Sequence, residues 1–203
     1  MGLRIGLLTG TFDPIHLGHL ELAKAAKSEC GLDEVWLMVN PKKVNSIIEF
    51  KDGVQDYRHR LKMSKLATED TVGVKVYVGP LAERPHTMTT FLELMRNNPD
   101  DKFVFIVGMD AISRLDGWED YESVVNSASF AVATRPGAVP ETINSLKRRL
   151  GPLGEALDVH LFEFDDHGAA TSTKIRDQIR SGQRPESVDD SVYEYILKHD
   201  LYI

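Results

Sequence analysis

Residues 3–19 read LRIGLLTGTFDPIHLGH, and this stretch decides the fold. It begins with an apolar run over 3–8, which is typical of a buried strand. A loop that contains Gly10 follows, and the apolar pattern of 17–30 then predicts a helix. The stretch therefore predicts a strand, a tight loop and a helix, the unit from which α/β folds are built.

The remainder of the chain alternates strand and helix patterns in the same way. Further strands are predicted over 34–39, 72–78, 102–107, 129–134 and 159–164. Further helices are predicted over 56–68, 89–97, 121–127, 141–150, 172–181 and 188–199. We therefore expect an α/β fold, a Rossmann-like, doubly wound and mostly parallel sheet with helices on both faces. Residues 1–203 are expected to form a single domain with a C-terminal helical part from about residue 172.

The composition narrows the classes of function. A net charge of −7 argues against nucleic-acid binding, which needs a basic face. The sequence shows neither an apolar run that could cross a membrane nor a signal-peptide pattern, so we expect a cytoplasmic protein without a membrane partner. The single cysteine, Cys30, lies in an apolar helical pattern and is expected to be a buried structural thiol. The oligomeric state stays open, and a homo-oligomer is among the states that the sequence allows.

The loop after the first strand has features of a phosphate site. Gly10 lets the backbone approach a ligand closely. His16 and His19 share one face of the predicted helix, and Gly18 between them leaves room for a nucleotide. The alternative is a tight turn before a capped helix, with both histidines exposed and idle. Their position after a strand and beside glycines favours the phosphate site, whose expected members are Gly10, Thr11, Phe12, His16, Gly18 and His19.

Other phosphate and metal motifs are absent from this loop. The sequence has no Gly-x-Gly-x-x-Gly dinucleotide fingerprint, no Gly-Lys-Ser/Thr phosphate loop and no His-Glu-x-x-His zinc motif. Two histidines without a carboxylate or a thiolate make a weak metal site. We therefore expect no metal ion held by the protein itself.

A second anchor lies near the C-terminus. Residues 171–176 read TSTKIR and open a predicted helix, with Thr171 or Ser172 as the N-cap. Lys174 and Arg176 lie in its first turn, where each exposed cation opposes the helix dipole at a cost of roughly 0.3–1 kcal/mol. A bound phosphate would reverse that cost, whereas the alternative is a solvated basic turn.

The two anchors resemble a known family. Residues 10–19 are similar to the signature of the nucleotidyltransferase superfamily with the His-x-Gly-His motif, and residues 172–176 to its Ser-Thr-x-Ile-Arg motif. Within this superfamily, the chain most resembles bacterial nicotinate-nucleotide adenylyltransferases. The resemblance implies transfer of AMP from ATP to nicotinate mononucleotide, which gives nicotinate adenine dinucleotide and pyrophosphate. It also implies that Mg²⁺ enters with ATP.

The resemblance further assigns roles to individual residues. The implied catalytic residues are His16, His19 and Arg176. The implied ATP-binding residues are Gly10, Thr11, Phe12, Gly18, Gly108, Asp110, Ser172 and Thr173. The implied acceptor-binding residues are Lys42, Lys43, Thr87, Trp118 and Arg135. Without the resemblance, Asp110 would be read as a helix cap, Trp118 as core and Arg135 as part of a surface turn. Arg60 and Met63 match a helix of the family and are expected to be structural.

Several alternatives remain at this point. The acceptor of an adenylyltransferase could instead be nicotinamide mononucleotide or phosphopantetheine, although phosphopantetheine enzymes are shorter and lack the Arg135-Pro136-Gly137 segment. A non-catalytic nucleotide-binding module belongs to a different class, and the intact anchors argue against it. His86 and Thr89 depart from the family pattern, so the preference between nicotinate and nicotinamide stays open.

Overall fold

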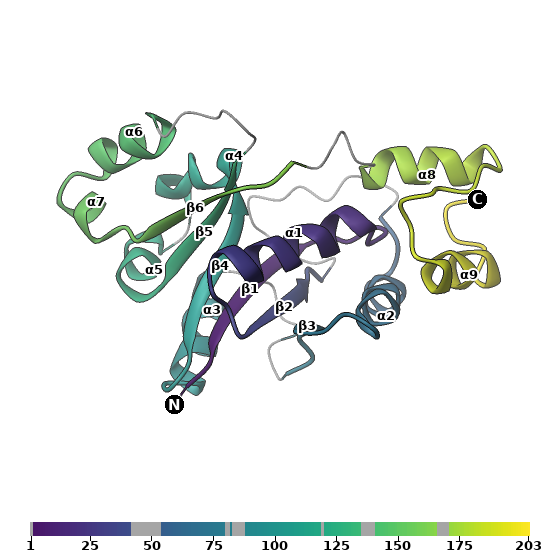
Figure 1. Ribbon diagram of the computed structural model, residues 1–203, viewed down its shortest axis with the longest axis horizontal. Coiled ribbons are helices and arrows are strands. Elements are labelled where there is room, and N and C mark those ends of the chain that lie inside the picture. Colours follow the sequence, from purple (N-terminus) through teal and green to yellow (C-terminus); the bar gives the residue numbers. More distant parts are fainter. Residues whose placement is uncertain are drawn as a thin grey trace.

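The sheet is wound in both directions from its first strand (Figure 1). The computed structural model describes residues 2–41, 54–79, 82, 88–118, 120–134, 141–165 and 171–203. Within these ranges, the strands are β1 (Arg4–Gly10), β2 (Glu34–Val39), β3 (Val74–Val76), β4 (Lys102–Gly108), β5 (Ser129–Thr134) and β6 (Val159–Glu163). They lie in the order β3-β2-β1-β4-β5-β6, and every described pairing is parallel. The expected Rossmann-like α/β class is confirmed.

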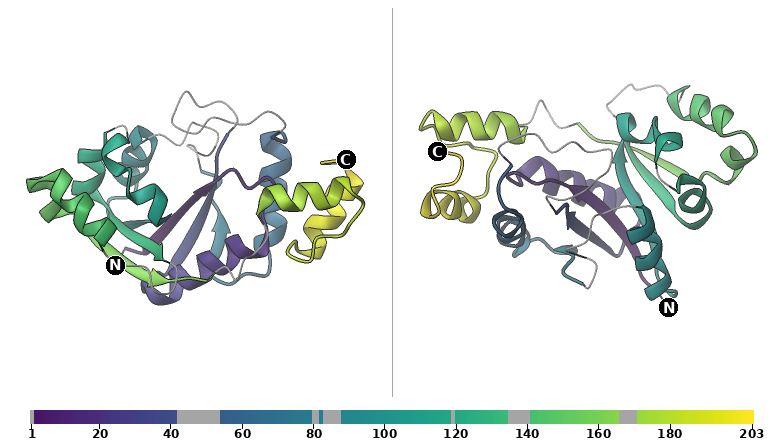
Figure 2. Two further views of the ribbon diagram at one scale, coloured as in Figure 1. Left: turned by 90° about the horizontal axis from the view of Figure 1, so that it is seen from above. Right: turned by 180° about the vertical axis from the view of Figure 1, so that it is seen from behind.

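Helices cover both faces of this sheet (Figures 1 and 2). One face packs against α1 (Leu17–Glu29), α2 (Tyr57–Thr68), α8 (Ser172–Arg180) and α9 (Asp190–Lys198). The other packs against α3 (Met88–Asn97), α4 (Met109–Ile112), the 3₁₀ helix η1 (Leu115–Gly117), α5 (Tyr121–Ser127), α6 (Glu141–Leu150) and α7 (Pro152–Ala156). The predicted elements agree with these bounds to within two residues at each end. The short helices α4, η1 and α7 were not predicted, because helices of so few residues show no apolar periodicity.

Side chains of the central strands alternate between two cores. Along β4, Phe103 and Phe105 pack on the α3 face, whereas Val104 and Ile106 pack on the α1 face. This alternation follows from the two-residue period of a strand, and burial on both faces explains the continuous apolar runs in the sequence. Cys30 belongs to the α1-face core, and burial raises the pKa of its thiol, in agreement with the expected structural role.

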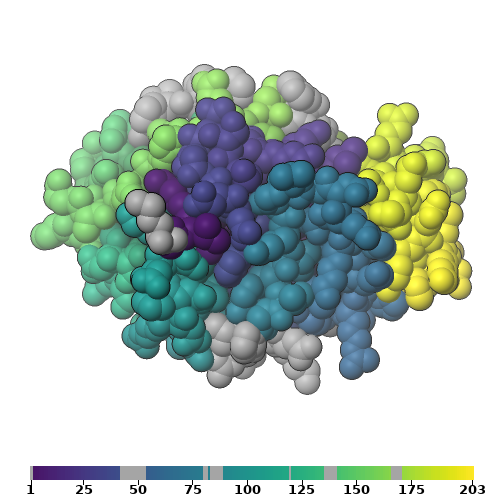
Figure 3. All heavy atoms as spheres, turned by 60° about the horizontal axis from the view of Figure 1, so that its bottom comes forward, coloured from purple at the N-terminus to yellow at the C-terminus, as the bar shows by residue number. Residues whose placement is uncertain are grey.

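The C-terminal helices join the α1-face core. Ile175 and Ile179 of α8 are buried in it together with Val192 and Ile196 of α9. Figures 1 and 3 show α9 beside α2 at one end of the molecule, and the two helices are in contact. Within the described ranges, no helix combines the length and the apolar character that a membrane crossing requires.

Candidate active site

The candidate site lies where the strand order reverses, at the carboxyl ends of β1 and β4. The pairing of β1 with β4 ends at Leu7 and Phe105, and each strand continues for three residues beyond it, to Gly10 and to Gly108. Open parallel sheets bind ligands in the crevice at this point. A Cβ built on Gly108 would meet no described atom within 4 Å, so the space beside this strand end is open.

Aromatic rings order the loop that follows β1. Phe12 has a φ of 49° and its ring covers Gly10, where an added Cβ would lie 2.8 Å from the Phe12 ring. The Phe12 ring meets the ring of His19 edge to face, with 5.0 Å between centroids, and the His19 and His16 centroids are 3.7 Å apart. The structure therefore explains Gly10 by packing against Phe12, whereas the sequence suggested close approach of a ligand.

His16 and His19 are bonded to each other at the N-terminus of α1. His16 is the N-cap, and its backbone N–H donates to Nδ1 of His19 at 3.2 Å. The backbone N–H of His19 donates in return to the carbonyl oxygen of His16 at 2.9 Å. Because Nδ1 of His19 accepts a hydrogen bond, the proton of its neutral ring lies on Nε2. Both rings are half-buried rather than exposed, and His19 offers an Nε2–H donor.

Burial keeps both imidazoles neutral. It lowers the pKa of His16 from 6.5 to about 4. It lowers the pKa of His19 from 6.5 to about 3, and the neighbouring His16 adds to the effect by opposing a second positive charge. At neutral pH, both rings of the free protein are therefore uncharged.

We expect the protein to lose stability as the pH falls below 6.5. In the unfolded chain these histidines take up protons near pH 6.5, whereas in the folded chain they do so near pH 4 and pH 3. The unfolded state thus binds more protons over this window, which favours unfolding. Urea unfolding at about pH 7 and about pH 5 measures the loss. The double variant His16→Gln/His19→Gln should lose less stability than wild type over this interval, and an equal loss would contradict the assignment.

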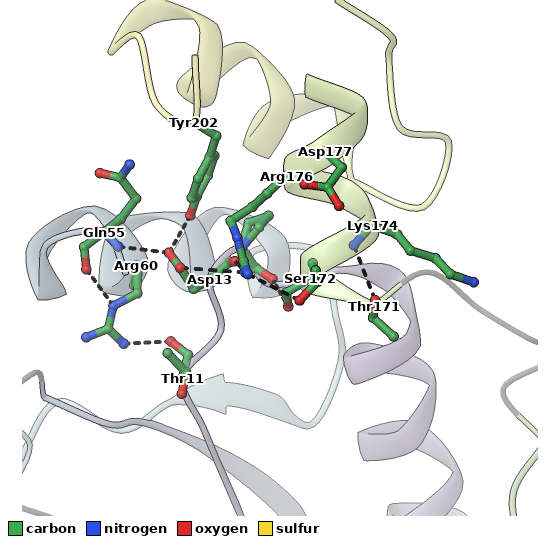
Figure 4. A network of polar contacts seen from close by, with 12 residues as sticks. Thr11, Asp13, Gln55, Arg60, Thr171, Ser172, Lys174, Arg176, Asp177 and Tyr202 are labelled. Carbon is green, nitrogen blue, oxygen red and sulfur yellow. Dashed lines mark hydrogen bonds and ion pairs between the residues drawn. The ribbon is translucent and has the colours of Figure 1, made fainter. Parts of the chain in front are cut away.

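The first turn of α8 is bonded directly to the loop after β1 (Figure 4). Oγ of Ser172 donates to the carbonyl oxygen of Pro14 at 3.0 Å. Nη1 of Arg176 donates to the carbonyl oxygen of Asp13 at 2.7 Å. These pairs are 158 and 163 positions apart in the chain. The structure thus brings the two sequence anchors together.

The N-terminus of α8 retains donors for an anion. Thr171 is the N-cap, and its hydroxyl accepts from the N–H of Lys174 at 3.2 Å. The backbone N–H groups of Ser172 and Thr173 donate no hydrogen bond within the described part of the chain. The side chain of Lys174 points away from the bonded groups in Figure 4. The cost of a cation in this turn is offset for Arg176 by its bond to Asp13.

The carboxylate of Asp13 is the centre of a buried polar network that the sequence did not predict. Asp13 is only 3% exposed, and its Oδ1 accepts from the Tyr202 hydroxyl at 2.7 Å and from the Gln55 N–H at 3.2 Å. Its Oδ2 lies 3.7 Å from Nη1 of Arg176 and accepts no hydrogen bond from the described residues. The sequence signal that could have revealed this network is a single acidic residue, Asp13, between Phe12 and Pro14 in the loop after β1.

Arg60 of α2 supports the same loop from the other side. Its side chain is fully buried, Nη1 donates to the carbonyl oxygen of Thr11 at 2.6 Å, and Nε donates to that of Gln55 at 2.9 Å. Met63, one helical turn further on, is also fully buried. These positions agree with the structural role expected for Arg60 and Met63.

Comparison with known proteins identifies the family. The cytidylyltransferase-like family model matches residues 7–178. The chain is 31% identical to a probable nicotinate-nucleotide adenylyltransferase of Shewanella frigidimarina, and the alignment covers 98% of this chain and 100% of the relative. It is 32% identical to a probable nicotinate-nucleotide adenylyltransferase of Streptococcus pyogenes serotype M3, over 98% of this chain and 88% of the relative. This chain belongs to the nicotinate-nucleotide adenylyltransferase family.

Solved structures show the same fold. Nicotinic acid mononucleotide adenylyltransferase of Plasmodium falciparum, complexed with APC, has a TM-score of 0.72 at 16% identity, over 98% of this chain and 97% of that chain. The same protein complexed with NaAD has a TM-score of 0.71. As a member of the nicotinate-nucleotide adenylyltransferase family, the protein is a nucleotide-binding nucleotidyltransferase of NAD biosynthesis.

The structure describes three of the other residues that the family motifs imply, namely Gly18, Asp110 and Trp118. Gly18 is half-buried in the first turn of α1, and Asp110 is exposed in α4, where its carboxylate makes no hydrogen bond within the described residues. Trp118 is partly buried against the α3-face core, with its ring 6.4 Å from that of Phe130. This position also fits the alternative in which Trp118 is a core residue. Outside the described residues lie Lys42, Lys43, Thr87 and Arg135.

Proposed function

We propose that this enzyme transfers the adenylyl group of ATP to nicotinate mononucleotide, with nicotinate adenine dinucleotide and pyrophosphate as products. The observation that carries the proposal is the pair of bonds from Ser172 and Arg176 to the backbone of the β1 loop. They hold the N-terminus of α8 beside the loop that carries His16 and His19. A triphosphate between these elements meets helix N–H groups, neutral imidazoles and a guanidinium, all of which favour phosphate oxygens.

Adenylyl transfer needs no activated nucleophile, because the 5′-phosphate of the acceptor is already an anion at neutral pH. One of its oxygens attacks the α-phosphorus of ATP in line and forms the new P–O bond. The bond between the α-phosphorus and the bridging oxygen breaks, and pyrophosphate leaves with the electron pair. We assign Nε2–H of His19 to the phosphate oxygen on which charge develops, with His16 beside it. Such catalysis depends on positioning and on stabilisation of charge.

The other site residues bind the substrates in this proposal. Arg176 and the backbone N–H groups of Thr11 and Phe12 hold the α- and β-phosphates. The backbone N–H groups of Ser172 and Thr173 add donors from α8, since the Ser172 hydroxyl is bonded to a carbonyl. Gly108 and Asp110 receive the ribose of ATP, with the carboxylate on its hydroxyls. The acceptor is held by Lys42, Lys43, Thr87, Trp118 and Arg135.

Mg²⁺ is part of the substrate in this proposal. Among the described residues, no group of three or more His, Cys, Asp or Glu side chains could hold a metal ion. We therefore assign phosphate oxygens of ATP and water as the ligands of the ion, which suits its preference for hard oxygen ligands. When bound, it neutralises charge on the phosphates.

We also propose that residues 1–203 form one domain in which the C-terminal part, from about residue 172, completes the site. The burial of Ile175 and Val192 in the α1-face core supports this organisation. The cytoplasmic location, the absence of a nucleic-acid partner and the homo-oligomer stay predictions.

Pyrophosphate release tests the proposed function. MgATP is supplied with nicotinate mononucleotide, nicotinamide mononucleotide or phosphopantetheine. We expect kcat/KM with nicotinate mononucleotide to exceed that with nicotinamide mononucleotide by about ten-fold or more, because a site built for a carboxylate leaves its donors poorly paired with an amide. We expect no release with phosphopantetheine. A preference for nicotinamide mononucleotide would reassign the acceptor, and no release with any acceptor would favour a non-catalytic module.

A further inference from the structure

The chain ends by turning back into the core beside the active site. After α9, Tyr202 has a φ of 66° and is only 5% exposed, and Leu201 is 4% exposed. A left-handed backbone is unfavourable for a tyrosine and persists where the surroundings hold the residue in place. The last turn of the chain is therefore arranged so that the side chain of Tyr202 points inward.

The target of this tyrosine is the carboxylate of Asp13, which lies directly beneath it in Figure 4. The hydroxyl donates to Oδ1 at 2.7 Å, a short bond of the kind that a charged acceptor makes. Burial, the charge of Asp13 and this bond raise the pKa of Tyr202 above its usual 10. The hydroxyl therefore keeps its proton and acts as a donor at neutral pH.

The second carboxylate oxygen of Asp13, Oδ2, faces Arg176 but does not accept a hydrogen bond from it. Oδ2 lies 3.7 Å from Nη1 of Arg176, while the same nitrogen donates to the backbone carbonyl of Asp13 at 2.7 Å. Nη2 of Arg176 donates to Oγ1 of Thr173 at 3.2 Å. Because the ion pair is this long, the hydrogen bond of the guanidinium is to the backbone carbonyl of Asp13 and not to the carboxylate.

We propose that Tyr202 is a positioning residue for ATP binding, which fixes the Asp13 carboxylate and thereby the place of Arg176. This inference rests on the proposed function. Without the hydroxyl, the donor that Oδ1 of Asp13 retains within the described part of the chain is the Gln55 N–H at 3.2 Å. A buried carboxylate that lacks donors turns toward the nearest cation. Among the described residues, Arg176 is the cation that forms an ion pair with this carboxylate, at 3.7 Å, and it is then drawn away from the phosphates.

The test is the kinetics of Tyr202→Phe with MgATP and nicotinate mononucleotide. We expect the KM for ATP to rise by about ten-fold, with kcat changed by less than about three-fold, because Arg176 binds phosphate in the ground state and in the transition state alike. A purely structural role for the hydroxyl would lower the active fraction, which reduces kcat and leaves KM unchanged. That pattern would overturn the proposal.

Tyr195→Phe is the matched control. It also removes one hydroxyl near the C-terminus, since the Tyr195 hydroxyl lies 3.0 Å from Nδ1 of His59 at the contact between α9 and α2. We expect its KM for ATP to equal that of wild type. An equal rise in KM for both variants would show a general effect of loosening the C-terminal helices and would contradict the role assigned to Tyr202.

A double-mutant cycle tests the route through Arg176. In the Arg176→Ala background, Tyr202→Phe should change kcat/KM for ATP by less than about two-fold, because the group that it positions is already absent. The same fold-change in both backgrounds would overturn the route.

If Tyr202→Phe fails to fold, Asp13→Asn takes its place, because it retains an acceptor for Tyr202 and removes the charge that faces Arg176. Because no carboxylate is then left to draw Arg176 away from the phosphates, Asp13→Asn should leave the KM for ATP within about two-fold of wild type, and a ten-fold rise would overturn the route.

ATP binding measured by calorimetry without acceptor separates this inference from the proposed function. Weaker ATP binding by Tyr202→Phe than by wild type and by Tyr195→Phe supports the positioning role even if no tested acceptor is turned over. Equal ATP affinity in all three proteins overturns it. Turnover by the wild type is the separate test of the function itself.

Discussion

His19→Ala lowers kcat for pyrophosphate release by about 10²–10³-fold, because it removes a preorganised donor from the phosphates at the moment when charge develops. The free energy of unfolding changes by about 1 kcal/mol or less, the usual cost of a lost bond at a helix N-terminus. Steady-state kinetics and urea unfolding on the same preparation measure the two effects. Full turnover by the variant would exclude His19 as the catalytic donor.

Two further substitutions at this position separate the nitrogens of the ring. Asn places a polar group near Nδ1, where it can accept from the N–H of His16, whereas Gln reaches the position of Nε2. Because we assign catalysis to Nε2–H, His19→Gln should retain more activity than His19→Asn. His19→Asn should retain more of the stability. The opposite order of activities would show that Nδ1 matters for the reaction.

Arg60→Ala reduces the free energy of unfolding by about 3–5 kcal/mol, the range expected when one member of a buried charged network is removed. The fully buried guanidinium donates to the carbonyl oxygens of Thr11 and Gln55, and both lose their donor in the variant. The carboxylate of Asp13 also loses a favourable charge, since the two groups interact across the loop. The cavity that the removed side chain leaves beside α2 further lowers the free energy of unfolding.

Arg58→Ala is the control for this prediction. Arg58 lies in the same helix two positions earlier and its side chain is exposed, so its removal should change the free energy of unfolding by less than about 0.5 kcal/mol. Urea unfolding of both variants gives the comparison. If Arg60→Ala proved as stable as Arg58→Ala, the buried network would not be what holds the loop.

Most of the fold could be predicted because its evidence is local. The apolar runs of β1 and β4 and the helical pattern of α1 each depend on neighbouring residues, so a short window of sequence reveals them. Very short elements such as α4 could not be predicted for the same reason, because one turn has no period. Edge strand β3 is shorter than expected, and Val72 and Val78 just outside it are exposed.

The candidate site was predictable only in part. His16 and His19 stand out by their spacing, and Ser172 to Arg176 by cations in a first helical turn. The packing of Gly10 against Phe12 could not be predicted, because the sequence does not reveal that the Phe12 ring folds back over this glycine. The importance of Asp13 was missed, because its partners are distant in the chain.

By itself, the sequence determined the alternation of strands and helices, and it pointed to two segments, 10–19 and 172–176, as the candidate phosphate site. Only the tertiary structure decided which hydrogen bonds connect these two segments to each other and to the C-terminal residues. The bond from Tyr202 to Asp13 spans 189 positions, and it exists because the left-handed turn after α9 aims the last tyrosine into the core. Local periodicity specifies which face of an element is buried, but a hydrogen bond between distant residues depends on how the buried faces pack together.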